Sequence, residues 1–306
     1  MGPPGNFTQG GTSSIAPEPS VRPESGEFSR EPTSNELRKD SRLKKHPGRR
    51  RAALLLLFLI PLLLGGRSSP PASAQTREIV VAAAISLSEA FNEIGRLYHD
   101  RTGYTVTFSF ASSGELERQI EAGAPVDVFA SAGEREMDQL QARQLIEQST
   151  RVDFARNALV LVVPAGSKAA LHSFADLQDP KVKRIAIGNP KTVPAGQYAE
   201  QLLRHMQLWP KVESRLVLAE NVRQVLDYVV REEVDAGIVY ATDANIAKGK
   251  SSVVAAAPEQ DYGPVLYPIA VVKGSGSAQA AKGFVNLVQS PDGVRILTKY
   301  GFLAPK

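Results

Sequence analysis

Small polar residues and glycines follow apolar strand-like segments at four places in the chain. They are Ser86, Ser112-Ser113-Gly114, Pro194-Ala195-Gly196 and Asn221-Val222. A helix is expected to begin at each place, and the first backbone N–H groups of a helix have no partner within it. Hydroxyls and free N–H groups are neutral donors, and helix N-termini favour anions. Together with the phenol of Tyr240 at a strand end, these donors are typical of a site for a compact anion.

The same residues also have an ordinary structural interpretation. Serine is a common N-cap, and glycine and proline are frequent in loops of any α/β protein. The anion site is supported by the recurrence of the same arrangement at four places, and open α/β sheets bind ligands at the carboxyl ends of their strands. Gly114 and Gly196 would let the backbone approach closely. From the residues alone, both interpretations stay open.

The elements that must position these donors are strands that alternate with helices. Residues 79–85 are apolar and small, as in a buried parallel strand, and from Leu87 the apolar residues recur at helical spacing. This alternation predicts βαβ units and an α/β fold with mostly parallel sheets. Further strands are expected at 104–110, 126–131, 158–163, 184–188, 216–219, 236–240 and 267–272, and helices at 115–122, 134–143, 278–289 and 293–300.

The N-terminal region differs from the rest of the chain. Residues 1–50 are rich in Pro, Gly, Ser and charge, which predicts a disordered basic extension. Residues 51–74 contain the apolar run 52–64 and an Ala-Ser-Ala site, which predicts a signal peptide cleaved after Ala74. The alternative is an uncleaved anchor, although this run is shorter than the roughly 20 residues that span a bilayer.

Charge and composition argue against several classes of function. Residues 1–74 hold 11 of the 36 Lys and Arg and 6 of the 32 Asp and Glu, so the body from 75 onward carries 25 basic and 26 acidic residues. A nearly neutral body gives no indication of nucleic-acid binding. The chain has no cysteine, and its four histidines form no metal or catalytic motif. We therefore expect no enzyme, no cofactor and no residue that ligates a metal cation directly.

Residues 78–304 resemble the periplasmic molybdate-binding proteins of ABC transporters. Several sequence blocks carry this resemblance in the family's order. They are Val81–Leu87, Phe110–Gly114, Arg118–Phe129, Gly188–Pro190 with Val193–Gly196, Glu220–Arg223, Gly237–Tyr240 and Tyr267–Val271. One departure is Ile85, where many relatives have a smaller residue before the serine.

The resemblance implies five residues that hold the oxyanion. Ser86, Ser113 and Tyr240 would donate through hydroxyls, and Ala195 and Val222 through backbone N–H groups. Arg223 is expected at the rim of the pocket or towards the transporter rather than on the ligand. Desolvated neutral donors would select by size and geometry, which favours molybdate or tungstate over sulfate.

The resemblance also implies a two-lobed periplasmic binding protein of type II. Residues 75–156 with 268–306 would form one lobe and 157–267 the other, joined by two crossover segments. Such a protein would be an extracytoplasmic monomer that delivers its ligand to an ABC permease and binds no nucleic acid. The alternatives are a binding protein for sulfate, phosphate or a small organic anion, and a regulatory effector-binding domain. The last would need a DNA-binding module, which the sequence does not offer.

Overall fold

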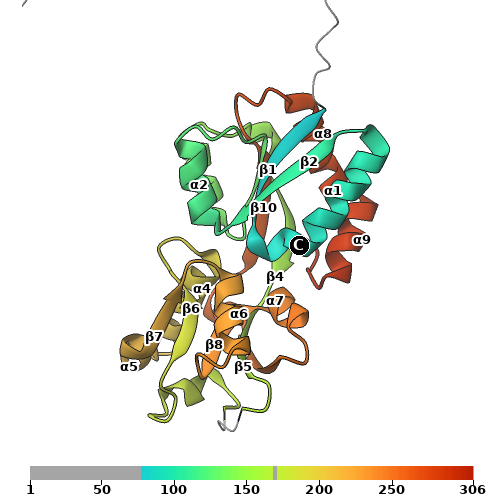
Figure 1. The fold of residues 1–306 in the computed structure, drawn as a ribbon. Coiled ribbons are helices and arrows are strands. Elements are labelled where there is room, and N and C mark those ends of the chain that lie inside the picture. Colours follow the sequence, from blue (N-terminus) through green and yellow to red (C-terminus); the bar gives the residue numbers. More distant parts are fainter. Residues whose placement is uncertain (1–76, 168–170, 306) are drawn as a thin grey trace, which may run out of the picture. The chain divides into compact units, whose positions relative to one another are not determined.

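The structure is a computed structural model that describes residues 77–167 and 171–305 (Figure 1). The predicted basic extension, the signal peptide and the apolar run 52–64 lie outside the described residues. Within the described residues, no helix combines the length and apolar character needed to cross a membrane.

The first of two five-stranded sheets is built from both ends of the described chain. Its strands have the order β2-β1-β3-β10-β4. Apolar residues suit β1 to an inner position in the sheet, where it can be covered on both faces, and β2 pairs with it in parallel along its whole length. The strand bounds are β1 Glu78–Ala84, β2 Thr105–Ala111, β3 Val128–Ala130, β4 Val152–Asn157 and β10 Val265–Val271.

Helices cover both faces of this sheet. In Figure 1, α1, α8 and α9 lie on one side and α2 lies on the other. The ring of Phe91 on α1 packs against Phe108, Phe154 and Phe284, so that one aromatic cluster joins helices and strands. The bounds are α1 Ser88–Thr102, α2 Ser113–Glu121, α3 Glu134–Ala142, α8 Ala278–Gln289 and α9 Pro291–Lys299.

The second sheet contains the middle of the chain, in the order β7-β6-β8-β5-β9. Its inner strands β5, β6 and β8 are buried at every position. The strands are β5 Leu159–Pro164, β6 Ile185–Gly188, β7 Leu216–Ala219, β8 Ala236–Tyr240 and β9 Ser251–Ala256, and the helices are α4 Pro194–His205, α5 Trp209–Val212, α6 Val222–Val230 and α7 Ala241–Ile246.

Both sheets are mixed in the same way. In the first sheet β2, β1 and β3 are parallel neighbours, and β10 runs antiparallel between β3 and β4. In the second sheet β7, β6 and β8 are parallel neighbours, and β5 runs antiparallel between β8 and β9. Four of five strands in each sheet therefore point in one direction, which fits the expected α/β class.

The chain passes between the two sheets twice. β4 ends at Asn157 and β5 begins at Leu159, so that one residue separates the sheets there. The return runs from the end of β9 at Ala256 to the start of β10 at Val265. The division into lobes at 156 and 267 stays a prediction, and β10 begins two residues before its second boundary.

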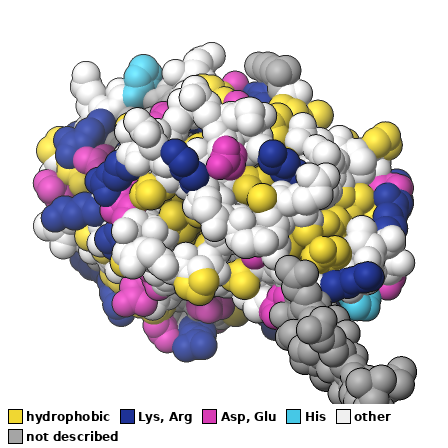
Figure 2. Space-filling view, turned by 90° about the horizontal axis from the view of Figure 1, so that it is seen from above, with side chains coloured by type: hydrophobic (Ala, Val, Ile, Leu, Met, Phe, Trp, Pro, Cys, Tyr) yellow, Lys and Arg dark blue, Asp and Glu magenta, His cyan; other side chains and the backbone are white. Residues whose placement is uncertain are grey.

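Charged side chains are interspersed on the surface. On the face shown in Figure 2, basic and acidic side chains lie among one another, and no broad area of one sign is visible. This distribution agrees with the balanced charge of the body.

Candidate anion-binding site

A small pocket brings together all five residues proposed from the sequence. The first sheet contributes Ser86, in the short 3-10 turn Ile85–Leu87 after β1, and Ser113, the first residue of α2. The second sheet contributes Ala195 at the start of α4, Val222 at the start of α6 and Tyr240 at the end of β8. The other lining residues are Ala84, Ile85, Ala111, Ser112, Ala132, Val193 and Pro194. All lining residues are uncharged.

The backbone N–H groups of Ala195 and Val222 are buried hydrogen-bond donors without an acceptor among the described residues. The two residues are 1% and 4% exposed. Within the described part of the chain, neither N–H group donates a hydrogen bond, and the same holds for the N–H of Ser113. Buried backbone donors without partners are rare. Three of them at one pocket indicate that an acceptor belongs there.

The hydroxyls of Ser86 and Ser113 each have a hydrogen-bond partner within the protein. Ser113 Oγ accepts a hydrogen bond of 3.0 Å from the N–H of Ala132. Ser86 Oγ lies 3.0 Å from the Tyr267 hydroxyl. Because Ser113 accepts from the protein, its own hydrogen is free for a ligand.

Tyr240 has its hydrogen directed elsewhere in this structure. Its hydroxyl donates to the carbonyl oxygen of Ala132 over 2.9 Å. Burial raises the pKa of Tyr240 well above its usual value, so the phenol keeps its proton. A phenol has one hydrogen. Tyr240 must therefore turn its O–H away from Ala132 in order to donate to a ligand.

Two glycines permit the backbone approaches on which the pocket depends. A Cβ on Gly196 would lie 2.0 Å from the carbonyl oxygen of Gly188, and a Cβ on Gly114 would lie 2.7 Å from that of Thr192. The N–H of Gly114 also donates to Thr192 over 3.0 Å. Gly114 thus brings α2 of the first sheet against the loop before α4 of the second.

Arg223 is the cation nearest in sequence to a pocket residue, and it is neutralised by two acids. Its guanidinium contacts Glu89 at 2.8 and 3.1 Å and Asp243 at 3.2 Å. Burial would raise the pKa of Glu89, but the hydrogen bonds and charge of Arg223 lower it. Burial raises the pKa of Asp243 to about 6, against the opposing effect of Arg223. Arg223 therefore bridges the two sheets and does not line the pocket.

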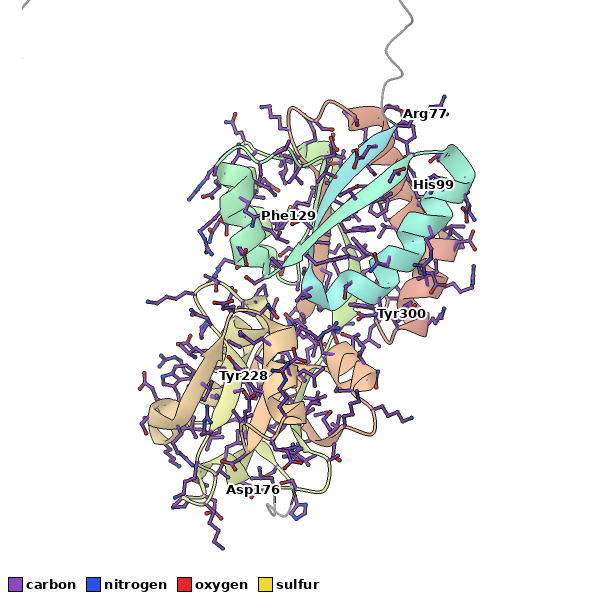
Figure 3. The ribbon with its side chains drawn as sticks, viewed as in Figure 1. Arg77, His99, Phe129, Asp176, Tyr228 and Tyr300 are labelled. Carbon is purple, nitrogen blue, oxygen red and sulfur yellow. The ribbon has the colours of Figure 1, made fainter. Side chains whose placement is uncertain are left out.

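Among the described residues, no histidine and no acidic residue lines the pocket. His99, labelled in Figure 3, lies near the C-terminal end of α1, whereas Ser86 precedes that helix. Residues 77–167 and 171–305 contain no group of acids and histidines arranged to hold a metal ion. Ile85, the departure from the family pattern, lines the pocket and removes no donor.

Two polar residues next to the pocket lining were not predicted as functional residues from the sequence. Tyr267 was expected only as part of a strand and of one block that resembles the family, and Asn157 was not singled out, yet both are buried, Tyr267 next to Ser86 and Asn157 next to Tyr267. Tyr267 is a polar group in the mainly apolar strand β10, whereas Asn157 ends β4, whose mixed sequence gives no such signal.

The fold and the pocket define a class of solute-binding protein, and comparisons with known proteins give the family. The chain belongs to the bacterial extracellular solute-binding proteins, which it matches over residues 79–303.

Individual relatives make the similarity more specific. The chain is 39% identical over 233 residues to a molybdate-binding protein of Escherichia coli (strain K12), covering 74% of this chain and 88% of the relative. It is 37% identical over 227 residues to a putative ABC transporter substrate-binding lipoprotein of Bacillus subtilis (strain 168), covering 74% and 86%. The structure of the Azotobacter vinelandii periplasmic molybdate-binding protein matches with a TM-score of 0.68 and 25% identity, over 74% of this chain and all of the other. The two-lobed fold expected from the sequence is thereby confirmed.

Proposed function

We propose that this protein captures molybdate outside the cytoplasmic membrane and delivers it to the permease of an ABC transporter. The observation that carries the proposal is a buried, uncharged pocket that collects donors from both sheets and includes three N–H groups without partners. Such donors suit a dianion whose oxygens all accept hydrogen bonds. Close relatives named as molybdate-binding proteins support the same ligand.

In the proposed mechanism, each lobe supplies part of the cage. Ser86 and Ser113 bind from the first lobe, and Ala195, Val222 and Tyr240 bind from the second. The oxyanion binds the closed arrangement best because only closure brings every donor to it, and this shifts the open–closed equilibrium. Tungstate, which has the same charge and tetrahedral shape, should bind as well.

Selectivity follows from the absence of a charged side chain in the pocket lining. A free Arg or Lys would attract any anion, whereas fixed neutral donors favour an anion large enough to reach all of them. A donor left unpaired costs about 1–3 kcal/mol. Sulfate is smaller and should be disfavoured. It remains the second candidate, because it also has four acceptor oxygens and no proton, while a small organic anion would lack the bidentate Arg that usually holds it.

We further propose that the protein acts as an exported monomer without a cofactor, released by cleavage near Ala74.

Equilibrium dialysis of the purified protein against molybdate, followed by elemental analysis, tests the ligand directly. About one molybdenum per chain, retained in the presence of excess sulfate, is the expected result. No retained molybdenum would reject the proposal.

A further inference from the structure

Three buried polar side chains form a chain of hydrogen bonds that ends at the pocket. The Tyr267 hydroxyl lies 3.0 Å from Ser86 Oγ and 3.1 Å from Asn157 Nδ2. Tyr267 is fully buried and Asn157 is 2% exposed. Of these three residues only Ser86 lines the pocket, so the other two act on a ligand through Ser86.

The orientation of the Asn157 amide is fixed by the backbone. The N–H of Ala158 donates to Asn157 Oδ1 over 2.9 Å. With the amide turned round, two N–H groups would face each other. The Nδ2 group therefore faces away from Ala158, and its two hydrogens are directed to Tyr267 at 3.1 Å and to the Thr242 hydroxyl at 2.9 Å.

The orientation of the Asn157 amide determines whether the Tyr267 hydroxyl donates to Ser86 or accepts from it. Burial raises the pKa of Tyr267 well above its usual value, so it keeps its single hydrogen. Because Tyr267 Oη accepts from Asn157, that hydrogen is available for Ser86 Oγ. The reverse arrangement, in which Ser86 donates to Tyr267, would leave the phenolic hydrogen buried without a partner, which is unfavourable.

Ser86 is then left with its own hydrogen pointing into the pocket. The hydrogen of the Ser113 hydroxyl is also available for a ligand, because Ser113 Oγ accepts a hydrogen bond of 3.0 Å from the N–H of Ala132. Each serine hydroxyl thus has its hydrogen available for a ligand and one of its two acceptor positions already occupied, so that both are set to donate to a ligand rather than to accept from it. With the backbone N–H groups of Ala195 and Val222, the cage offers donors at every one of these positions.

We infer that Tyr267 and Asn157 are positioning residues that hold Ser86 as a donor, so that the pocket accepts fully deprotonated oxyanions and rejects those that keep a proton. This inference rests on the proposed function and deepens it. Size alone does not separate sulfate from phosphate, because the two ions are similar in size and shape. Phosphate near neutral pH carries at least one proton, which needs an acceptor, and sulfate carries none.

The test is the variant Tyr267→Phe, titrated with molybdate directly and with sulfate and phosphate in competition. The variant removes the donor to Ser86, whose hydroxyl can then turn and accept the proton of phosphate. We expect molybdate affinity to fall by roughly tenfold or less, and the ratio of sulfate to phosphate affinity to fall by roughly tenfold. A merely structural role of Tyr267 would weaken all three ions together and leave this ratio unchanged.

Tyr98→Phe is the matched control. Tyr98 is also a buried tyrosine of the first lobe, and its hydroxyl donates to the Ala280 carbonyl over 2.6 Å, away from the pocket. Its loss should leave the ratio as in the wild type. Asn157→Ala is a second variant, which frees Tyr267 to accept from Ser86 and should move the ratio in the same direction.

The outcomes separate this inference from the proposed function. Wild-type protein that binds molybdate, with an unchanged ratio in both folded variants, overturns the positioning role alone. Wild-type protein that prefers sulfate rejects molybdate as the ligand, and the change in ratio still tests the positioning role. Wild-type protein that binds none of the three ions overturns both.

Discussion

Arg223 holds both carboxylate oxygens of Glu89, at 2.8 and 3.1 Å, and the two residues belong to helices of different lobes. Both are partly buried, with side chains 20% and 33% exposed. A bidentate pair of this kind fixes geometry as well as charge. It holds the lobes together beside the pocket and removes the positive charge that would attract unselected anions.

Glu89→Gln should therefore weaken the closure of the two lobes, while the hydrogen-bond donors of the pocket stay in place. The variant keeps the shape of the side chain and loses the ionic part of the contact. We expect molybdate affinity to fall by about 1 kcal/mol, mainly through faster dissociation. Stopped-flow displacement measures the rate, and Glu93→Gln is the control, because Glu93 pairs with Lys299 within the first lobe. Equal dissociation rates in Glu89→Gln and the wild type would show that the pair does not stabilise closure.

The serine donors can be removed one at a time. Ser86→Ala and Ser113→Ala should each weaken molybdate binding by about 1–3 kcal/mol, because an oxyanion oxygen then loses its partner in a desolvated site. Calorimetric titration measures the change. Ser109→Ala on the neighbouring strand β2, outside the pocket lining, should bind as the wild type does. If both pocket variants retain full affinity, the assignment of the site is wrong.

Tyr240→Phe tests whether the phenol turns towards the ligand. The hydroxyl donates to Ala132 in this structure, and we expect it to exchange that bond for one to the oxyanion. Its loss should reduce affinity by about 1 kcal/mol and change the melting temperature little. The control Tyr262→Phe removes a buried hydroxyl that accepts from the N–H of Leu159 over 3.2 Å, away from the pocket. A collapse of the melting temperature in Tyr240→Phe would instead assign this hydroxyl a structural role.

Gly114→Ala should hold the lobes apart. The added Cβ would lie 2.7 Å from the carbonyl oxygen of Thr192 in the other lobe, and a backbone atom cannot rotate away. Affinity should fall by about tenfold or more, while the unfolding of the ligand-free protein changes little. Gly276→Ala is the control, because its Cβ would meet no atom within 4 Å. Wild-type affinity in Gly114→Ala would show that the closed form tolerates a wider separation.

Glu117 should make stability depend on pH. Burial, followed by the nearby charge of Glu121, raises its pKa from 4.5 to about 7. The native state then binds more protons than the unfolded state between these values, so the free energy of unfolding falls as pH rises from about 4.5 to 7.

The variant Glu117→Gln removes this dependence. Above pH 7 it should be more stable than the wild type, by on the order of 1–3 kcal/mol, and near pH 4.5 the difference should be small. Urea unfolding at several pH values measures it, with the exposed Glu115→Gln on the same helix as control. A constant difference across the pH range would contradict a raised pKa.

Local sequence patterns predicted most of the helices and strands and the residues that line the pocket. The apolar run at 79–85 became β1, and the helical spacing after Leu87 became α1, because each pattern lies within one element. The five proposed ligand residues lie at helix starts and a strand end that such patterns mark. Their meeting in one pocket was expected from the family resemblance rather than from spacing.

Features set by distant pairing were not predictable in the same way. β4 mixes Asp153 and Arg156 with apolar residues, and β9 consists of small residues at a sheet edge, so neither has a strong strand pattern. Glu89 and Arg223 are 134 residues apart, and Ser86 and Tyr267 are 181 apart. Only the packing of the two lobes brings these pairs together.

The most direct test of the central claim is calorimetric titration of the purified protein with molybdate, tungstate, sulfate and phosphate under identical conditions. A cage of neutral donors predicts tight binding of molybdate and tungstate at one ion per chain, with sulfate much weaker and phosphate weaker still. Sulfate binding as tight as molybdate binding, or no heat from any of the four ions, would contradict it.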